Sequence, residues 1–90
     1  MNKNMFFYAY NVTLTQLFIG ICEKTYIYMA RCYNRIYKDD IAKFIDYEAF
    51  GMNEAQFLEQ SKIALINLIE QDVIVADGDF FYKLNPALRV

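Results

Sequence analysis

The sequence predicts a mainly α-helical domain that ends in a small β-hairpin, which is an α+β fold. Apolar residues recur at three- and four-residue steps over 13–37 and again over 54–71, a spacing typical of amphipathic helices. Two short β-rich runs, 73–76 and 80–84, flank Asp77-Gly78-Asp79, and Asp-Gly between such runs is a strong hairpin signal. Ninety residues are enough for one small domain, so we expect a single unit over 1–90.

The chain is expected to begin with an aromatic segment, followed by a long helical region. Residues 5–10 alternate too weakly to decide between a strand and an arm packed on the body, so either is expected over 1–12. The helical region 13–37 contains Gly20, which leaves open one helix or two and gives three or four helices in total. Its expected buried stripe is Leu14, Leu17, Phe18, Ile21, Cys22, Thr25, Tyr28, Met29, Cys32, Tyr33 and Ile36.

The middle of the chain predicts two helices separated by a sharp turn, over 39–71. Asp39 is a suitable N-cap for a short helix over 40–46, and Asn53 is a suitable N-cap for the longer helix. Gly51 can supply the positive φ angle that the turn between them needs. The short helix is expected to bury Ile41, Ala42, Phe44 and Ile45. The longer helix is expected to bury Phe57, Leu58, Ser61, Ala64, Leu65, Leu68 and Ile69.

Composition limits the function classes. Hydrophobic residues make up 57% of the chain and aromatic residues 18%, more than one small core can hide, so we expect an apolar interface. The net charge of −2 argues against nucleic-acid binding, because proteins that bind phosphate backbones normally carry a basic excess. If DNA is bound, the nine basic residues must be concentrated on one face.

The cysteines and the uncharged N-terminal stretch indicate a cytoplasmic protein. Cys22 and Cys32 on one helix would lie about 15 Å apart, too far for a disulfide, so we expect buried, reduced thiols. Residues 5–22 carry no charge, yet Asn11, Thr13, Thr15 and Gln16 interrupt the apolar run. We therefore expect neither a membrane span nor a secretory signal.

Catalysis has little support in the sequence. The chain contains no His, which removes the commonest general base at neutral pH and the commonest metal ligand. Neither cysteine has a His partner that could activate it as a nucleophile, and no phosphate-binding or dinucleotide motif is present. We expect no enzyme activity, no metal site and no cofactor.

The second half of the chain resembles the winged helix-turn-helix family. The residues that carry the resemblance are Asp40-Ile-Ala-Lys-Phe-Ile45, Gly51-Met52-Asn53, Ala64-Leu65, Leu68-Ile69 and Val73-Ile74, within 39–86. The resemblance implies a recognition helix in the DNA major groove and a two-stranded wing over 73–84. The chain departs from the family by about one extra turn in the third helix. Glu54 and Glu59 also depart from it, because they repel phosphate.

Candidate DNA contacts come from three places. Lys24, Arg31, Arg35 and Lys38 fall within roughly 60° of one another on a continuous helix, at about 100° per residue. This basic row is either a phosphate-contacting edge or an ordinary solvated face. Candidates on the third helix are Gln56, Gln60, Ser61 and Lys62; the resemblance adds Lys43 on the short helix and Lys83 on the wing.

A subunit interface is expected where apolar residues have no place in the core. Ile63 and Ile66 point roughly 110–170° away from the inner face of the third helix. They form either an interface or part of a broader core. Tyr8 and Tyr10 are further interface candidates, and Tyr26, Ile27 and Tyr37 add similar surface.

Two functions remain open at this point. The first is sequence-specific DNA binding as a small homodimer, either as a transcriptional repressor or as a plasmid or phage partition adaptor. The partition role rests on similarity to the centromere-binding TubR adaptors of tubulin-type plasmid partition, which would work with a filament-forming partner. The second is an acidic module that binds a host or partner protein and no DNA.

Overall fold

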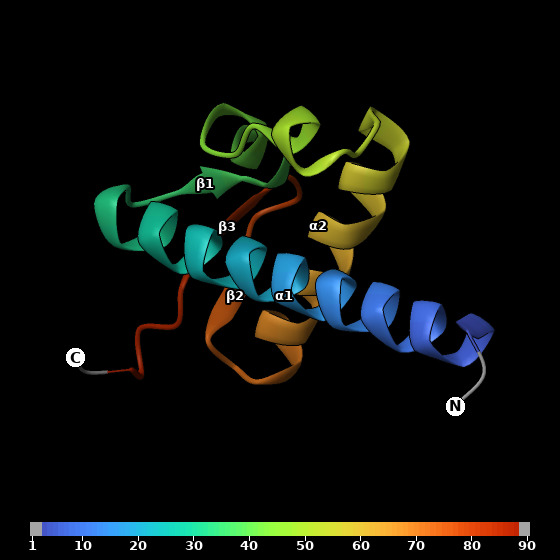
Figure 1. Cartoon of the computed structure of the whole chain (residues 1–90). Coiled ribbons are helices and arrows are strands. Elements are labelled where there is room, and N and C mark those ends of the chain that lie inside the picture. Colours follow the sequence, from blue (N-terminus) through green and yellow to red (C-terminus); the bar gives the residue numbers. More distant parts are fainter. Residues whose placement is uncertain (1–2, 89–90) are drawn as a thin grey trace.

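The computed structural model describes the backbone of residues 3–88 and the side chains of residues 14–88. The fold is mainly helical with a small three-stranded antiparallel sheet, so the predicted α+β class is confirmed (Figure 1). The elements in chain order are α1 (Lys3–Cys32), β1 (Ile36–Tyr37), the 3-10 helices η1 (Lys38–Lys43) and η2 (Tyr47–Phe50), α2 (Glu54–Glu70), β2 (Ile74–Asp77) and β3 (Phe81–Leu84).

Helix α1 is longer and starts earlier than the sequence suggested. It runs unbroken through residues 5–10, so the expected strand or arm over 1–12 is wrong for residues 3–12. It also continues through Gly20, so one helix forms where a pair was possible. Adding a residue to an existing helix costs little, and one Gly costs only about 1 kcal/mol relative to Ala. The helix therefore continues until packing or a stronger breaker stops it.

Helix α1 also ends earlier than expected. The predicted end near residue 37 is wrong, because Ile36 and Tyr37 form strand β1 and pair with Tyr82 and Phe81 of β3. Pairing buries Ile36 to 3% exposure, which a longer helix could not do, since it would carry this residue away from the sheet. The basic row is consequently split: Lys24 and Arg31 lie on α1, whereas Arg35 and Lys38 follow it.

The short helix expected over 40–46 is replaced by η1 and η2. The cap residue before η1 is Tyr37 and makes no side-chain capping bond, so the prediction of Asp39 as N-cap is wrong. A 3-10 helix rises about 2.0 Å per residue against about 1.5 Å in an α-helix. Ile41 and Ile45 are both buried, while Ala42 and Phe44 are exposed, contrary to the expectation.

The turn before α2 follows the prediction. Gly51 has φ 75°, a left-handed conformation in which other residues are strained. Asn53 then caps α2: its side chain accepts a hydrogen bond from the Gln56 backbone N–H at 2.9 Å. The Gln56 side-chain oxygen in turn accepts from the Asn53 N–H at 3.0 Å, which completes a capping box. This turn fixes where α2 begins and how it is directed.

The hairpin is confirmed, and a third strand joins it. Strands β2 and β3 pair antiparallel from Ile74 opposite Leu84 to Asp77 opposite Phe81, and Gly78 in the turn has φ 83°. The sheet order is β1-β3-β2, so the strand that follows α1 pairs with the last strand of the chain. Strand β1 was not predicted, because its two residues are too few to give a sequence pattern.

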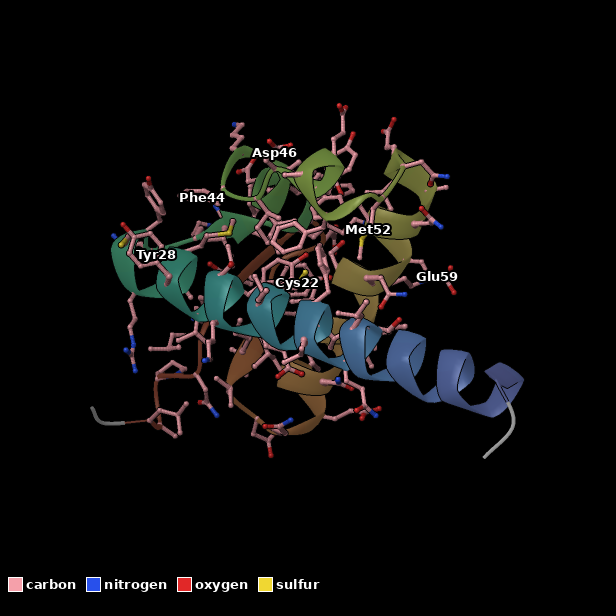
Figure 2. All side chains as sticks on the ribbon, viewed as in Figure 1. Cys22, Tyr28, Phe44, Asp46, Met52 and Glu59 are labelled. Carbon is pink, nitrogen blue, oxygen red and sulfur yellow. The ribbon has the colours of Figure 1, made fainter. Side chains whose placement is uncertain are left out.

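The core lies between α1, α2 and the sheet. Cys22, Phe57, Ala64 and Ile74 are at most 1% exposed and come from all three layers. Figure 2 shows Cys22 directed into this interior and Glu59 on α2 directed away from it. Tyr26 was expected on the surface, and this is wrong: it is 1% exposed and donates a hydrogen bond to the Lys38 carbonyl at 3.1 Å. Its ring belongs to the same helical face as Cys22, four residues earlier.

Several residues expected in the core lie on the surface instead. On α1 the buried face is Phe18, Cys22, Tyr26, Met29 and Ala30. Much of the predicted stripe is therefore outside: Leu14, Leu17, Ile21, Tyr28, Cys32 and Tyr33 are exposed. On α2, Leu58 and Ile69 are exposed as well, whereas the other five expected residues are buried. Apolar residues surround α1 on most sides, so the sequence pattern could not define its inner face.

Candidate nucleic-acid interface

The outward face of α2 is the surface that the sequence analysis expected to meet DNA. Its exposed residues include Ala55, Glu59, Ile63, Ile66 and Glu70, on the side opposite the buried Ala64 and Leu68. This face therefore combines carboxylates with two isoleucines and carries no arginine. A carboxylate repels the phosphate backbone, so the center of the face is unfavourable for a duplex.

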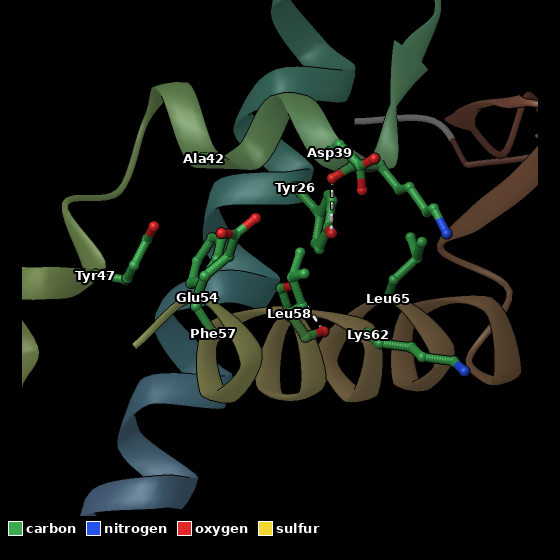
Figure 3. A pocket seen from close by; sticks show the side chains of 11 residues that line it. Tyr26, Asp39, Ala42, Tyr47, Glu54, Phe57, Leu58, Lys62 and Leu65 are labelled. Atoms are coloured by element: carbon green, nitrogen blue, oxygen red, sulfur yellow. Dashed lines mark hydrogen bonds between the residues drawn. The ribbon is translucent and has the colours of Figure 1, made fainter. Parts of the chain in front are cut away.

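A cavity beside this face brings lysines close to α2. It has a volume of about 430 Å³ and lies between η1, the start of α2 and the Tyr26 side of α1 (Figure 3). Lys38 and Lys62 line it together with Asp39 and Glu54. Two ammonium groups and two carboxylates thus share one rim. An anion near Lys38 and Lys62 would be attracted by two charges and repelled by two.

The remaining polar candidates on α2 are occupied or buried. Ser61 is 4% exposed and donates to the Leu58 carbonyl at 3.2 Å, so its assignment as a DNA contact is wrong. The Gln56 side chain is held in the capping box described above. Gln60 is half-buried, with a buried side-chain oxygen that has no hydrogen-bond partner. Lys62 alone of these four is both exposed and charged.

The basic residues on α1 lie on the other side of the molecule. Lys24 and Arg31 are exposed, and Lys24 is about 200° around the helix from the buried Cys22. Because α1 and α2 pack into one core, their outward faces point in opposite directions, and Figure 1 shows α1 in front of α2. One duplex could therefore not lie along both faces.

Arg35, the third member of the basic row, is engaged within the chain. Its Nε lies 3.1 Å from an Asp77 carboxylate oxygen, and its Nη2 donates to the Asp77 carbonyl at 3.2 Å. Its guanidinium also lies over the Phe81 ring, 4.3 Å from the centroid. These contacts join the segment before β1 to the hairpin, so Arg35 has a structural role in addition to any role in binding.

Replacing Arg35 by Met is expected to destabilise the fold by about 1 kcal/mol. The ion pair is largely solvated and the cation–π contact is exposed, so each contributes at most about 1 kcal/mol. Urea unfolding monitored by circular dichroism measures the loss. Arg31→Met is the matched control, because Arg31 forms no ion pair among the described residues. Equal stability of the two variants would contradict a structural role for Arg35.

The two basic residues added by the family resemblance occupy different settings. Lys43 on η1 is exposed and pairs with Asp40, three residues earlier, at 3.2 Å. Lys83 on β3 is half-buried and lies opposite Val75 of β2. Lys43 has a carboxylate partner that would have to be displaced or shared by a phosphate.

The proposed interface residues are only partly described. Ile63 is 37% exposed and Ile66 is 41% exposed, so both are available at the surface as expected. The side chains of Tyr8 and Tyr10 lie outside the described residues, although their backbone is part of α1. Tyr37 and Ile27 are half-buried rather than open surface.

The two cysteines differ in their surroundings. Both are free thiols; Cys22 is buried as expected, whereas Cys32 is exposed, contrary to the expectation. Burial raises the pKa of the Cys22 thiol to about 12, so it remains protonated at neutral pH. Across the described residues, no group of three or more Cys, Asp or Glu side chains is arranged to hold a metal ion.

The comparisons with known proteins identify no family for this chain. No family model matches the chain, and neither curated proteins nor solved structures include a significant match. Within the described part of the chain, no helix has the length and apolar character needed to cross a membrane.

Two functionally relevant features were missed from the sequence. One is the Arg35–Asp77 pair, whose partners are 42 residues apart and become neighbours only through the pairing of β1 with β3. The other is the exposed apolar row on α1, formed by Leu14, Leu17 and Ile21. A signal for this row was present, since residues 4–22 contain no charge at all and cannot all face a small core.

Proposed function

We propose that the chain is a winged-helix protein that binds DNA through the α2 side of the fold. The observation that carries this proposal is the order of elements together with the β1-β3-β2 sheet. A helix, a strand, short helical turns, a longer helix and a hairpin follow one another, and the first strand pairs with the last. This arrangement supports the family resemblance noted in the sequence, in which α2 would serve as the recognition helix.

The charges restrict which residues can contact the phosphate backbone. Lys38 and Lys62 share the rim of the cavity beside α2, and Lys43 lies on the adjacent η1. Lys24 and Arg31 face the opposite side and are excluded from the same contact. Glu54 and Glu59 offset part of the attraction, so binding is expected to be weak and strongly salt-dependent. A repressor or a partition adaptor could reach useful affinity by tethering two such domains.

The charge argument can be tested without knowing the target sequence, because backbone binding is largely independent of sequence. Fluorescence anisotropy would measure binding of a labelled duplex between about 50 and 200 mM salt. The slope of log K against log salt is negative. In the double variant Lys38→Gln, Lys62→Gln, it is expected to become shallower by about 2, because two phosphate contacts are lost.

The control removes the same charge from the opposite face. Lys24→Gln with Arg31→Gln is expected to leave the salt slope unchanged, because those residues lie away from α2. Absence of binding at the lowest salt would contradict the proposal. A reduced salt slope in the control pair, with an unchanged slope in the Lys38 and Lys62 variant, would place the DNA on α1 instead.

A second candidate is an acidic protein-interaction module, and the outward face of α2 favours it. Glu59 and Glu70 accompany Ile63 and Ile66 on this face, a combination that suits a basic and apolar surface of another protein. The titration above separates the candidates. A folded protein that binds no DNA at low salt would favour the interaction module, and a host or filament-forming protein would then be the expected class of partner.

A further inference from the structure

Helix α1 presents an apolar row to solvent beside the buried Phe18, next to η2. Leu14 is 45% exposed, Leu17 is 60% exposed and Ile21 is 38% exposed, at the three- and four-residue steps of one helical face. Phe50 of η2 is 52% exposed beside them, and with Met52 these residues line a groove of about 420 Å³. A monomer would leave this whole row in water.

Gly20 lies within the same part of α1 and has no reason in the monomer to be glycine. A Cβ atom at this position would meet nothing within 4 Å. Glycine inside a helix costs about 0.5–1 kcal/mol relative to alanine, chiefly in backbone entropy. The absence of a side chain at Gly20 would allow a helix from another molecule to pack closely against α1.

The charge pattern identifies the kind of molecule that fits this surface. No charged residue occurs between Lys3 and Glu23, so the row offers nothing to attract phosphate or a strongly charged protein. A second copy of this chain carries the same uncharged row. The rest of the chain has a net charge of −2, so this row is where two copies can meet without like-charge repulsion.

We propose that two copies associate through α1, with the helices antiparallel and crossing near Leu17, within one helical turn of Gly20. In this register Leu14 of each copy lies opposite Ile21 of the other, and Leu17 lies close to the twofold axis. Lys24 then faces the uncharged N-terminal part of the second helix. Each copy offers the same patch, as a closed twofold dimer requires.

The length of α1 provides the contact area. The first 20 residues of α1 form a stretch about 30 Å long. The N-terminal end of α1 extends beyond the rest of the fold (Figure 1), and the longest dimension of the chain is 48 Å. Phe50 and Met52 extend the contact surface on the η2 side, and a stable dimer needs roughly 800 Å² from each subunit.

Sedimentation equilibrium of the full chain tests the dimer without DNA, so it is independent of the DNA-binding proposal. Leu17→Glu is expected to raise the dimer dissociation constant by more than about 100-fold, because a carboxylate would be buried without a partner. Ile66→Glu on α2 is the matched control and is expected to leave the dimer intact. A wild-type chain that sediments as a monomer would overturn the proposal.

Gly20→Leu supplies a second variant that cannot fail by unfolding α1, because leucine has a higher helix propensity than glycine. It is expected to weaken the dimer by about tenfold or more while thermal stability of the separated chain is kept or increased. If both Gly20→Leu and Leu17→Glu remain dimeric while Ile66→Glu dissociates, the interface lies on α2. A dimer that fails to bind DNA would contradict only the DNA-binding proposal.

Discussion

Replacing Phe57 by Ala is expected to destabilise the fold by about 3–5 kcal/mol, the range for removing a large aromatic side chain from a core. Phe57 is 1% exposed and stacks on Tyr47, with ring centroids 4.6 Å apart. Its ring also meets the edge of Phe18 from α1 at 6.1 Å. One side chain thus joins α2, η2 and α1.

Urea unfolding at a fixed protein concentration measures this loss, since any self-association would shift apparent stability. A small domain has about 5–15 kcal/mol of stability in total, so this substitution is expected to remove a large fraction of it. Phe80→Ala is the control, because Phe80 in the hairpin turn is 69% exposed and its loss leaves no cavity. Comparable destabilisation by the two substitutions would mean that Phe57 is not a core residue.

Alkaline pH is expected to unfold the protein, with Cys22 as a principal cause. Burial, assisted by the nearby charge of Glu23, raises the pKa of the Cys22 thiol from 9.0 to about 12. The folded state therefore favours the protonated thiol more than the unfolded state does. This contribution is fully present below about pH 9 and is lost as pH rises toward 12. Burial also raises the pKa of Tyr26, which adds a loss of the same sign above its ordinary value of 10.0.

Thermal unfolding between pH 8 and pH 11 would measure this dependence. Cys22→Ala is expected to be less stable than the original chain at pH 8, because it opens a small cavity, but its stability should fall less steeply above pH 9. Cys32→Ala is the control, since Cys32 is exposed and its replacement should leave the pH dependence unchanged. A pH dependence that is identical in all three proteins would remove Cys22 as the cause.

The parts of the fold that the sequence predicted well are those determined by adjacent residues. Asn53 and Gln56 cap each other within one turn, and Gly51 supplies the positive φ angle directly before them. Asp77-Gly78 likewise fixes a turn through residues next to one another. These interactions need no tertiary partner, so the local pattern was sufficient to locate α2 and the hairpin.

The parts that the sequence did not predict depend on contacts between distant segments. Ile36 became a strand residue because Tyr82 was available to pair with it, and Tyr26 became a core residue because its hydroxyl reaches the Lys38 carbonyl. Helical spacing placed only the basic row on one face, and the candidates on the third helix were identified separately. Packing of α1 against α2 then separated Lys24 and Arg31 from Lys62, a separation that spacing along the chain cannot reveal.

The sheet order has a consequence for how copies of this chain can aggregate. Strand β2 is an edge strand, so the backbone groups on its outer side are open to an added strand. Asp72 precedes it and Asp79 follows in the turn, whereas Asp77 at its end is paired with Arg35, so a second β2 docking there would bring four further carboxylates to this edge. Such crowding of negative charge discourages fibril growth through strand addition, leaving helical surfaces as the safer route for one molecule to recognise another.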